Sequence, residues 1–357
     1  MEEAFLALAR LGIGNAATEK LPDSIDWNAI EALAKQHGLL GVLVDGVEKL
    51  PQNERPPQLM WLRWIGEVMQ GYESQYVLYR KAVADLAAWY HAHGYRMMVL
   101  KGLACGMNWP KPEHRPYGDI DIYLFRQYKE ADAVLASEFG IKIDNSHHHH
   151  TVFRWQGFTV ENHYDFVNVN VHRSSRELET ILKKIANTND CLPLTAYGLM
   201  PSANLHALFL VRHMVSHFSG ASMSLRQVLD WGFFVKAYGK EVDWKWLVEV
   251  LEKYHMKEFY DCINAICVED LWFQDSCFKI QGSLRSKSSE NLKERILNDT
   301  LSPEFDGVQP KGLIRRVPFK YRRWKANAWK RELCYAESEK SSFWGGVWNH
   351  LLKPAGI

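Results

Sequence analysis

Apolar residues recur at steps of three and four over much of the chain, a spacing that predicts amphipathic helices. Asp26 stands where it can cap one such helix. Residues 58–93 contain no proline and continue the helical pattern, and Gly94 is placed to end it. Beyond Pro201 the same spacing predicts helices over 203–218, 224–237, 244–255 and 257–268.

The middle of the chain has a different pattern. Residues 96–102 form a short apolar run, residues 119–125 alternate acids with isoleucines, and residues 151–166 are rich in β-branched and aromatic side chains. A short helix over 128–140 separates the second run from the third. The pattern predicts an α+β fold, divided into an N-terminal helical region (1–95), a core with a small mixed sheet (96–200), a C-terminal helical domain (201–277), and a polar linker with a basic, aromatic-rich tail (278–357). Within the last segment, residues 278–310 are predicted to be a loop or partly disordered.

Asp119 and Asp121 are the residues on which the chemistry centres. On a strand, residues two apart share a face, so both carboxylates are expected to project together while Ile120 and Ile122 point into the core. Such carboxylates repel each other unless a cation joins them. Mg²⁺ binds through one or two carboxylates plus substrate phosphates, and Mn²⁺ is an alternative. A solvated acidic strand end is the alternative interpretation.

Basic and glycine residues surround this pair in the sequence. Lys101 and Gly102 end the preceding strand, and Arg115 lies four residues before Asp119. Glycine permits close approach of the backbone to a ligand, and both cations suit triphosphate oxygens. Taken one at a time, these residues are equally consistent with a turn glycine and surface bases.

The stretch LKGLACGMNWPKPEHRPYGDIDIYL resembles the signature of an uncharacterised bacterial nucleotidyltransferase family, a branch of the polymerase-β-like superfamily. Members of that family read roughly Leu-Lys-Gly, Tyr/Trp-Pro-x-Pro, Arg, then (Gly/Ser)-Asp-Ile-Asp. The segments WNAIEALAKQHGLLGVLVDGV and LRQVLDWGFFV resemble its helices on either side. The resemblance covers roughly residues 23–270 and implies a nucleotidyltransferase core.

The resemblance implies roles for particular residues. Asp119 and Asp121 would bind two Mg²⁺ ions, and Glu161 would be the third carboxylate, with Asp165 as the alternative. The nucleotide would lie against Lys101, Gly102, Arg115 and Gly118. His163 would orient Glu161, touch substrate or serve as a structural histidine. Arg226 and Asp230, one helical turn apart, would brace the site or simply form an ion pair.

The implied reaction is transfer of NMP from an NTP to an unidentified acceptor, with release of pyrophosphate. A toxin-like enzyme acting on tRNA or protein is one alternative. A non-catalytic nucleotide-binding module is another, because Lys101-Gly102-Leu103-Ala104 replaces the Gly-Ser turn of better-known relatives.

Two groups of histidines are interpreted more conservatively. A strand would divide His147–His150 between two faces, so this run is expected to be a polar strand entry, with contact to substrate as the alternative. His206, His213 and His217 share a helical face, for which packing is favoured over a role in lining the nucleotide cleft.

Charge and composition add a possible partner and a location. Residues 311–331 hold nine Lys or Arg and no acid, although the net charge of the chain is only +1. This run could bind nucleic acid, an acidic face of its own protein or an anionic membrane surface, or form a solvated helix face. No signal-peptide pattern, bilayer-length apolar run or Cys-x-x-Cys pair is found among the residues. We therefore expect a cytoplasmic protein without a transmembrane segment and with free thiols.

Overall fold

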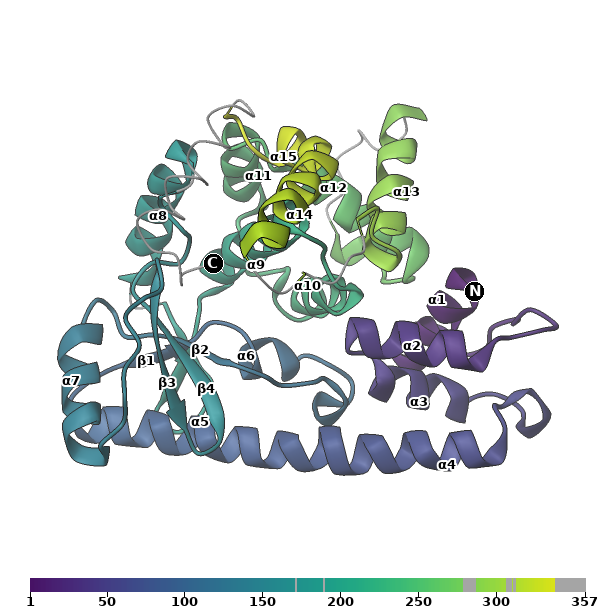
Figure 1. Cartoon of the computed structure of the whole chain (residues 1–357), viewed down its shortest axis with the longest axis horizontal. Helices are drawn as coiled ribbons and strands as arrows, with labels where there is room; N and C mark the ends of the chain where they lie inside the picture. The colour runs from purple at the N-terminus through teal and green to yellow at the C-terminus, as the bar shows by residue number, and fades with distance from the viewer. Residues whose placement is uncertain (171, 189, 279–286, 306–309, 311–312, 338–357) are drawn as a thin grey trace.

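A mixed sheet of six strands lies toward one end of the molecule, at the left of Figure 1. The computed structural model describes residues 1–170, 172–188, 190–278, 287–305, 310 and 313–337. The strand order is β3-β4-β2-β1-β6-β5, in which β1 runs parallel to β6 and β2 parallel to β4, and the other neighbours are antiparallel. The strands are β1 (Met97–Val99), β2 (Ile120–Tyr123), β3 (His150–Trp155), β4 (Phe158–His163), β5 (Leu192–Pro193) and β6 (Gly198–Met200). The predicted mixed sheet is confirmed.

One long helical segment runs along the molecule, beneath the sheet and the N-terminal helices (Figure 1). It consists of α4 (Gln58–Glu67), a π-helical turn (Val68–Glu73) and α5 (Ser74–Ala92), as the proline-free pattern predicts. Gly94 follows its end in the left-handed conformation, with φ of +79°. Helix α5 and α7 (Tyr128–Phe139) bury apolar side chains against one face of the sheet.

The N-terminal helices are α1 (Glu2–Gly12), α2 (Trp27–His37) and α3 (Leu40–Glu48), with a 3₁₀ turn at Gln52–Glu54. The predicted cap of α2 is confirmed, because the Asp26 carboxylate accepts hydrogen bonds from the backbone N–H groups of Asn28 and Ala29 at 3.0 and 3.1 Å. Gly38 ends α2 in the left-handed conformation, with φ of +66°. The helix therefore stops next to the segment that carries the candidate site.

The C-terminal helices cover the opposite face of the sheet. Met98, Leu100 and Tyr123 of the sheet share one apolar cluster with these helices and with the N-terminal helices. The helices are α8 (Arg173–Ala186), α9 (Ala203–Gly220), α10 (Leu225–Tyr238), α11 (Trp244–Lys253) and α12 (Lys257–Ala265), followed by a π-helical turn (Ile266–Asp270) and a 3₁₀ turn (Asp275–Cys277). This arrangement confirms the α+β class with flanking helices on both sides.

Part of the predicted linker is helical. Residues 278–310 are predicted as a loop, but α13 spans Lys287–Leu301. Its buried apolar side chains, Ile296, Leu297 and Leu301, lie in the second half of the helix, while the first half carries the polar residues that favour a loop. The prediction is wrong over this helix because a short apolar contact is enough to fix it against the core.

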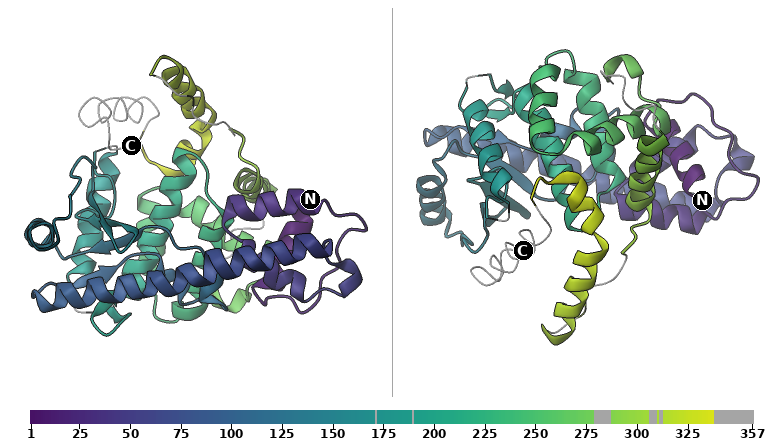
Figure 2. Two further views of the ribbon diagram at one scale, coloured as in Figure 1. Left: turned by 60° about the horizontal axis from the view of Figure 1, so that its bottom comes forward. Right: turned by 90° about the horizontal axis from the view of Figure 1, so that it is seen from above.

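The basic run forms α14 (Leu313–Ala326) and α15 (Ala328–Cys334), and α14 extends away from the rest of the chain (Figure 2). Lys330 points inward, where its Nζ lies 2.6 Å from Asp299 Oδ2 and both side chains are fully buried. Lys330 is therefore already paired with an acid of the same chain, whereas Arg322 and Lys325 of α14 are exposed. Binding of nucleic acid by residues 311–331 stays a prediction. Among the described residues, no helix is both long enough and apolar enough to cross a membrane.

Candidate active site

Two parallel strands supply the central acids. β2 and β4 pair so that Asp121 lies opposite Glu161 and Tyr123 opposite His163. Because alternate residues of a strand share a face, Glu161 and His163 project to the same side as Asp121. Ile120 and Ile122 are buried on the other side with α5, as predicted. Asp119 immediately precedes β2 and is exposed.

Asp121 is buried among two basic groups. Its Oδ1 lies 2.7 Å from Lys101 Nζ and 3.2 Å from His163 Nε2. Burial alone would raise the pKa of Asp121, but the charge of Lys101 and the hydrogen bond from His163 hold it well below its usual range. Glu161 lies 3.6 Å from the same His163 nitrogen. Burial raises the pKa of Glu161 too, but the nearby His163 ring outweighs burial, and the pKa of Glu161 is lowered overall. Both carboxylates are therefore charged at neutral pH.

Asp119 experiences the charge of the other two acids. Burial raises its pKa first, and the charges of Glu161 and Asp121 raise it further. A divalent cation would relieve this repulsion. Asp121, Glu161 and His163 offer ligand atoms that all lie within 4.8 Å of one another, and oxygen-rich sets of this kind suit such a cation. The residues present therefore fit the predicted metal, with Asp119 at the exposed edge of the group.

A cavity of about 360 Å³ lies beside Asp119 and Asp121, and Glu161 is not part of its lining. It is bordered by the end of α2, the turn between β1 and the short helix α6 (Leu103–Gly106), the segment before β2, α9, and the start of α10. Its lining includes the four predicted nucleotide-binding residues, Lys101, Gly102, Arg115 and Gly118, together with Asp119 and Asp121. The volume falls within the roughly 300–1,000 Å³ typical of small-molecule sites.

A family model described as "Uncharacterised nucleotidyltransferase" matches residues 23–272. The chain belongs to this family. The match runs from the residues that precede α2 through the whole sheet to the end of α12, so it includes every residue of the site described above. The chain matches no curated protein and no solved structure.

The turn after β1 requires glycine at position 102. Gly102 has φ of +57°, and a Cβ atom there would lie 2.1 Å from the Tyr79 hydroxyl oxygen. That hydroxyl donates a hydrogen bond of 3.0 Å to the carbonyl oxygen of Asp119. The turn that carries Lys101 and the strand end that carries Asp119 are therefore fixed by one tyrosine, which the sequence patterns did not single out.

Gly102→Ala is expected to destabilise the fold measurably. The left-handed backbone alone costs about 1–3 kcal/mol for a residue with a side chain, and displacement of Tyr79 adds to that cost. Gly118→Ala is the matched control in the same cavity, because a Cβ at position 118 would meet no atom within 4 Å. Denaturant unfolding checks both variants, and equal stabilities would contradict the role given to the turn.

Arg115 and Asp230 form a buried ion pair. The guanidinium donates two hydrogen bonds to the carboxylate, from Nε to Oδ1 at 2.8 Å and from Nη2 to Oδ2 at 2.9 Å. The indole N–H of Trp109 donates a third, at 2.9 Å to Oδ1. Of the two interpretations left open for Arg226 and Asp230, the ion pair between them is not formed, because Asp230 pairs with Arg115 instead. Arg115 borders the cavity, but its charge is already paired, which argues against its predicted contact with triphosphate.

Arg226 of α10 is a cation that remains available to a ligand in the cavity. It borders the cavity, and its Nε is buried without a hydrogen-bond partner among the described residues. Burial and then the charge of Arg115 lower its pKa. An anionic ligand in the cavity would supply the partner that this guanidinium lacks.

The two candidates for the third carboxylate lie in different surroundings. Glu161 lies beside Asp121 in the sheet. Asp165 follows the end of β4 and forms an ion pair with Lys183 of α8. The strand alternation that would place both on one face ends at His163. The geometry therefore favours Glu161.

The helical histidines divide into two environments. His213 and His217 border the cavity, with ring centroids 4.5 Å apart. Burial and then the charge of Lys101 lower the pKa of His217 to about 4 and hold the pKa of His213 well below its usual range. His206 is fully buried, with Nε2 3.8 Å from Cys105 Sγ. Of these three histidines, only His206 has the packing role that was favoured for all of them, because His213 and His217 border the cavity.

The structure of His147–His150 also differs from the predicted strand entry. Residues 147–149 form a bend, so the alternation of a strand does not apply to them, and only His150 belongs to β3. The structure brings His149 and His150 together with His163. Burial is the first cause of the low pKa of both rings, about 2 for His149 and about 4 for His150.

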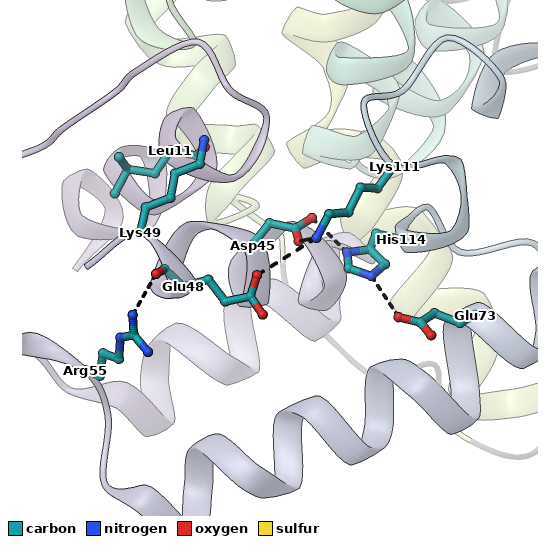
Figure 3. Close-up of polar contacts among 8 residues, drawn as sticks. All are labelled: Leu11, Asp45, Glu48, Lys49, Arg55, Glu73, Lys111 and His114. Carbon is teal, nitrogen blue, oxygen red and sulfur yellow. Dashed lines mark hydrogen bonds and ion pairs between the residues drawn. The ribbon is translucent and has the colours of Figure 1, made fainter. Parts of the chain in front are cut away.

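A polar cluster holds the segment that leads into β2. His114 lies between two carboxylates, with Nδ1 2.7 Å from Asp45 of α3 and Nε2 3.2 Å from Glu73 of the π-helical turn (Figure 3). Lys111 also forms an ion pair with Asp45. Lys111 immediately precedes a 3₁₀ turn (Pro112–His114), and His114 is the last residue of that turn. The cluster therefore ties the segment before Asp119 to two other elements.

The charge on His114 predicts a pH dependence. Burial opposes the charged ring, but Asp45 and Glu73 outweigh it, so the pKa of His114 is raised. The stability that charged His114 contributes to the fold is fully present below the ordinary histidine pKa of about 6.5. It is lost as pH rises through the higher pKa that His114 has in the folded protein. We expect the unfolding free energy of the wild type, relative to His114→Gln, to fall as pH rises above about 6.5. A constant difference across that range, measured by urea unfolding, would argue against a charged His114.

Proposed function

We propose that this chain is a metal-dependent nucleotidyltransferase, which transfers NMP from an NTP to an acceptor and releases pyrophosphate. One observation carries the proposal: Asp121 and Glu161 are neighbours on adjacent parallel strands, with Asp119 two residues earlier and a cavity alongside. Membership of the nucleotidyltransferase family supports the same reaction.

Asp119, Asp121 and Glu161 would hold two Mg²⁺ ions, for which Mn²⁺ can substitute. When bound, such ions neutralise charge on the phosphoryl oxygens and on the leaving pyrophosphate. Lys101 keeps Asp121 ionised, and His163 contacts both Asp121 and Glu161. The lowered pKa of Glu161 favours a role in holding metal over a role in taking up a proton.

The cavity would hold the NTP through its cations. Arg226 and Lys101 border it and can attract the triphosphate, and Gly118 leaves open space beside Asp119. In the transfer, the acceptor nucleophile forms a bond to the α-phosphorus while the bond from that phosphorus to the bridging oxygen breaks. Pyrophosphate leaves with the electron pair, and the acceptor's proton passes to water. Alignment of the two reactants supplies much of the rate.

The test supplies each of the four NTPs, labelled at the α-phosphate, with Mg²⁺ or Mn²⁺ and with separate pools of small molecules, RNA and protein. We expect transfer of label and release of pyrophosphate, both absent from the double variant Asp119→Asn/Asp121→Asn. Label on tRNA or protein would favour the toxin-like alternative. NTP binding without pyrophosphate release under any condition would favour a non-catalytic module and overturn the proposal.

A further inference from the structure

Three histidines meet beside the acidic group, where β3 joins β4. His150 begins β3 and pairs directly with His163 in the antiparallel ladder. The ring centroid of His149 lies 4.4 Å from that of His150 and 5.4 Å from that of His163. Each histidine offers a ring nitrogen, and the three nitrogens lie within 4.8 Å of one another. We propose that His149, His150 and His163 bind a transition-metal cation of the Zn²⁺ class, at a second site beside the carboxylates.

Buried nitrogen atoms without partners support this second site. His150 and His163 are 7% and 4% exposed. Within the described part of the chain, Nδ1 of His149 and Nδ1 of His150 are buried and make no hydrogen bond. A buried polar atom left without a partner costs free energy, and in native proteins it commonly marks an ion or a water. A cation bound by the lone pairs of the imidazole rings would supply the partner that these nitrogen atoms lack.

The donor type selects the class of cation. Imidazole nitrogen suits Zn²⁺ and its neighbours in the first transition row, whereas Mg²⁺ requires oxygen ligands. Zn²⁺ with three protein ligands takes its fourth from water. The charge of Lys101 opposes a cation here, while Asp121 and Glu161 favour one.

His163 connects the proposed site with the carboxylates. Its Nε2 lies 3.2 Å from Asp121 and 3.6 Å from Glu161. Its Nδ1 lies 3.3 Å from the carbonyl oxygen of Asp165, a contact at the long end of the hydrogen-bond range. An ion bound to His163 would compete with these contacts. Occupancy of the proposed site therefore affects Asp121 and Glu161 through the His163 ring.

The experiment titrates metal-free protein with Zn²⁺ in excess Mg²⁺ and without nucleotide, using a chromophoric chelator as competitor. Co²⁺ replaces Zn²⁺ in a parallel titration, to show tetrahedral coordination in the visible spectrum. The variants are His149→Ala and His150→Ala. His147→Ala is the matched control, since its ring stacks on His150 but does not belong to the three. Circular dichroism verifies that each variant folds.

The wild type is expected to bind one equivalent of Zn²⁺. Each of the two variants should weaken binding by more than the roughly 10–100-fold that loss of an outer-shell partner costs. His147→Ala should remain within about tenfold of the wild type, the lower end of that range. Wild-type affinity in both variants, or displacement of Zn²⁺ by an equal concentration of Mg²⁺, would overturn the proposal. Because binding is measured without turnover, this result is independent of the proposed transfer reaction.

Discussion

Asp119→Asn is expected to lower NMP transfer by about a hundred-fold to a thousand-fold, the range that loss of one preorganised electrostatic group costs. The same change is expected to leave the unfolding temperature unchanged or slightly higher. Asp119 is exposed overall, but its carboxylate is partly desolvated, and this raises its pKa first. The charges of Glu161 and Asp121 raise the pKa further, and a neutral Asn would remove this repulsion. Pyrophosphate release and thermal unfolding of the same preparation measure both effects.

Asp121→Asn is the matched comparison on the same strand. Its carboxylate neutralises Lys101 within a buried contact, so we expect this variant to lose stability as well as transfer. Transfer within about tenfold of the wild type in Asp119→Asn would contradict the catalytic role of that carboxylate, because even one oxyanion-stabilising donor costs about a hundred-fold.

Arg115→Leu is expected to reduce the free energy of unfolding by about 3–5 kcal/mol, the cost of breaking a buried ion pair from one side. Asp230 would remain buried with its charge, and the hydrogen bond from Trp109 alone would not compensate it. Urea unfolding measures this loss.

The double variant Arg115→Leu/Asp230→Leu separates the ion pair from the packing of its two side chains. It should recover part of the stability lost in Arg115→Leu, because no buried charge is then left without its partner. Arg226→Leu is the control on the same face of α10, since Arg226 forms no ion pair among the described residues and should lose less. A loss below about 1 kcal/mol for Arg115→Leu would contradict the structural role.

Local patterns predicted the elements of the fold better than its long-range contacts. The alternation over residues 119–125 requires only neighbouring residues, and it placed Ile120 and Ile122 in the core correctly. The pairing of Arg115 with Asp230 joins residues 115 positions apart, so helical spacing pointed to Arg226 instead. The role of Tyr79 could not be predicted either, because its contact with Gly102 is also long-range and forms only when the long helix packs under the sheet.

The candidate site was predictable in part. Asp119 and Asp121 followed from the sequence, and the resemblance to the family pointed to Glu161, which the strand register then placed beside Asp121. The three histidines could not be predicted, because the run at 147–150 was interpreted as a strand while its first three residues form a bend. A bend allows adjacent side chains to converge on His163, which strand alternation forbids.

The most direct test of the site is a crystal structure with a non-hydrolysable NTP and Mg²⁺. We expect metal density in contact with Asp119, Asp121 and Glu161, and the triphosphate in the cavity near Lys101 and Arg226. A nucleotide bound elsewhere, with those three carboxylates free of metal, would contradict the assignment of the active site.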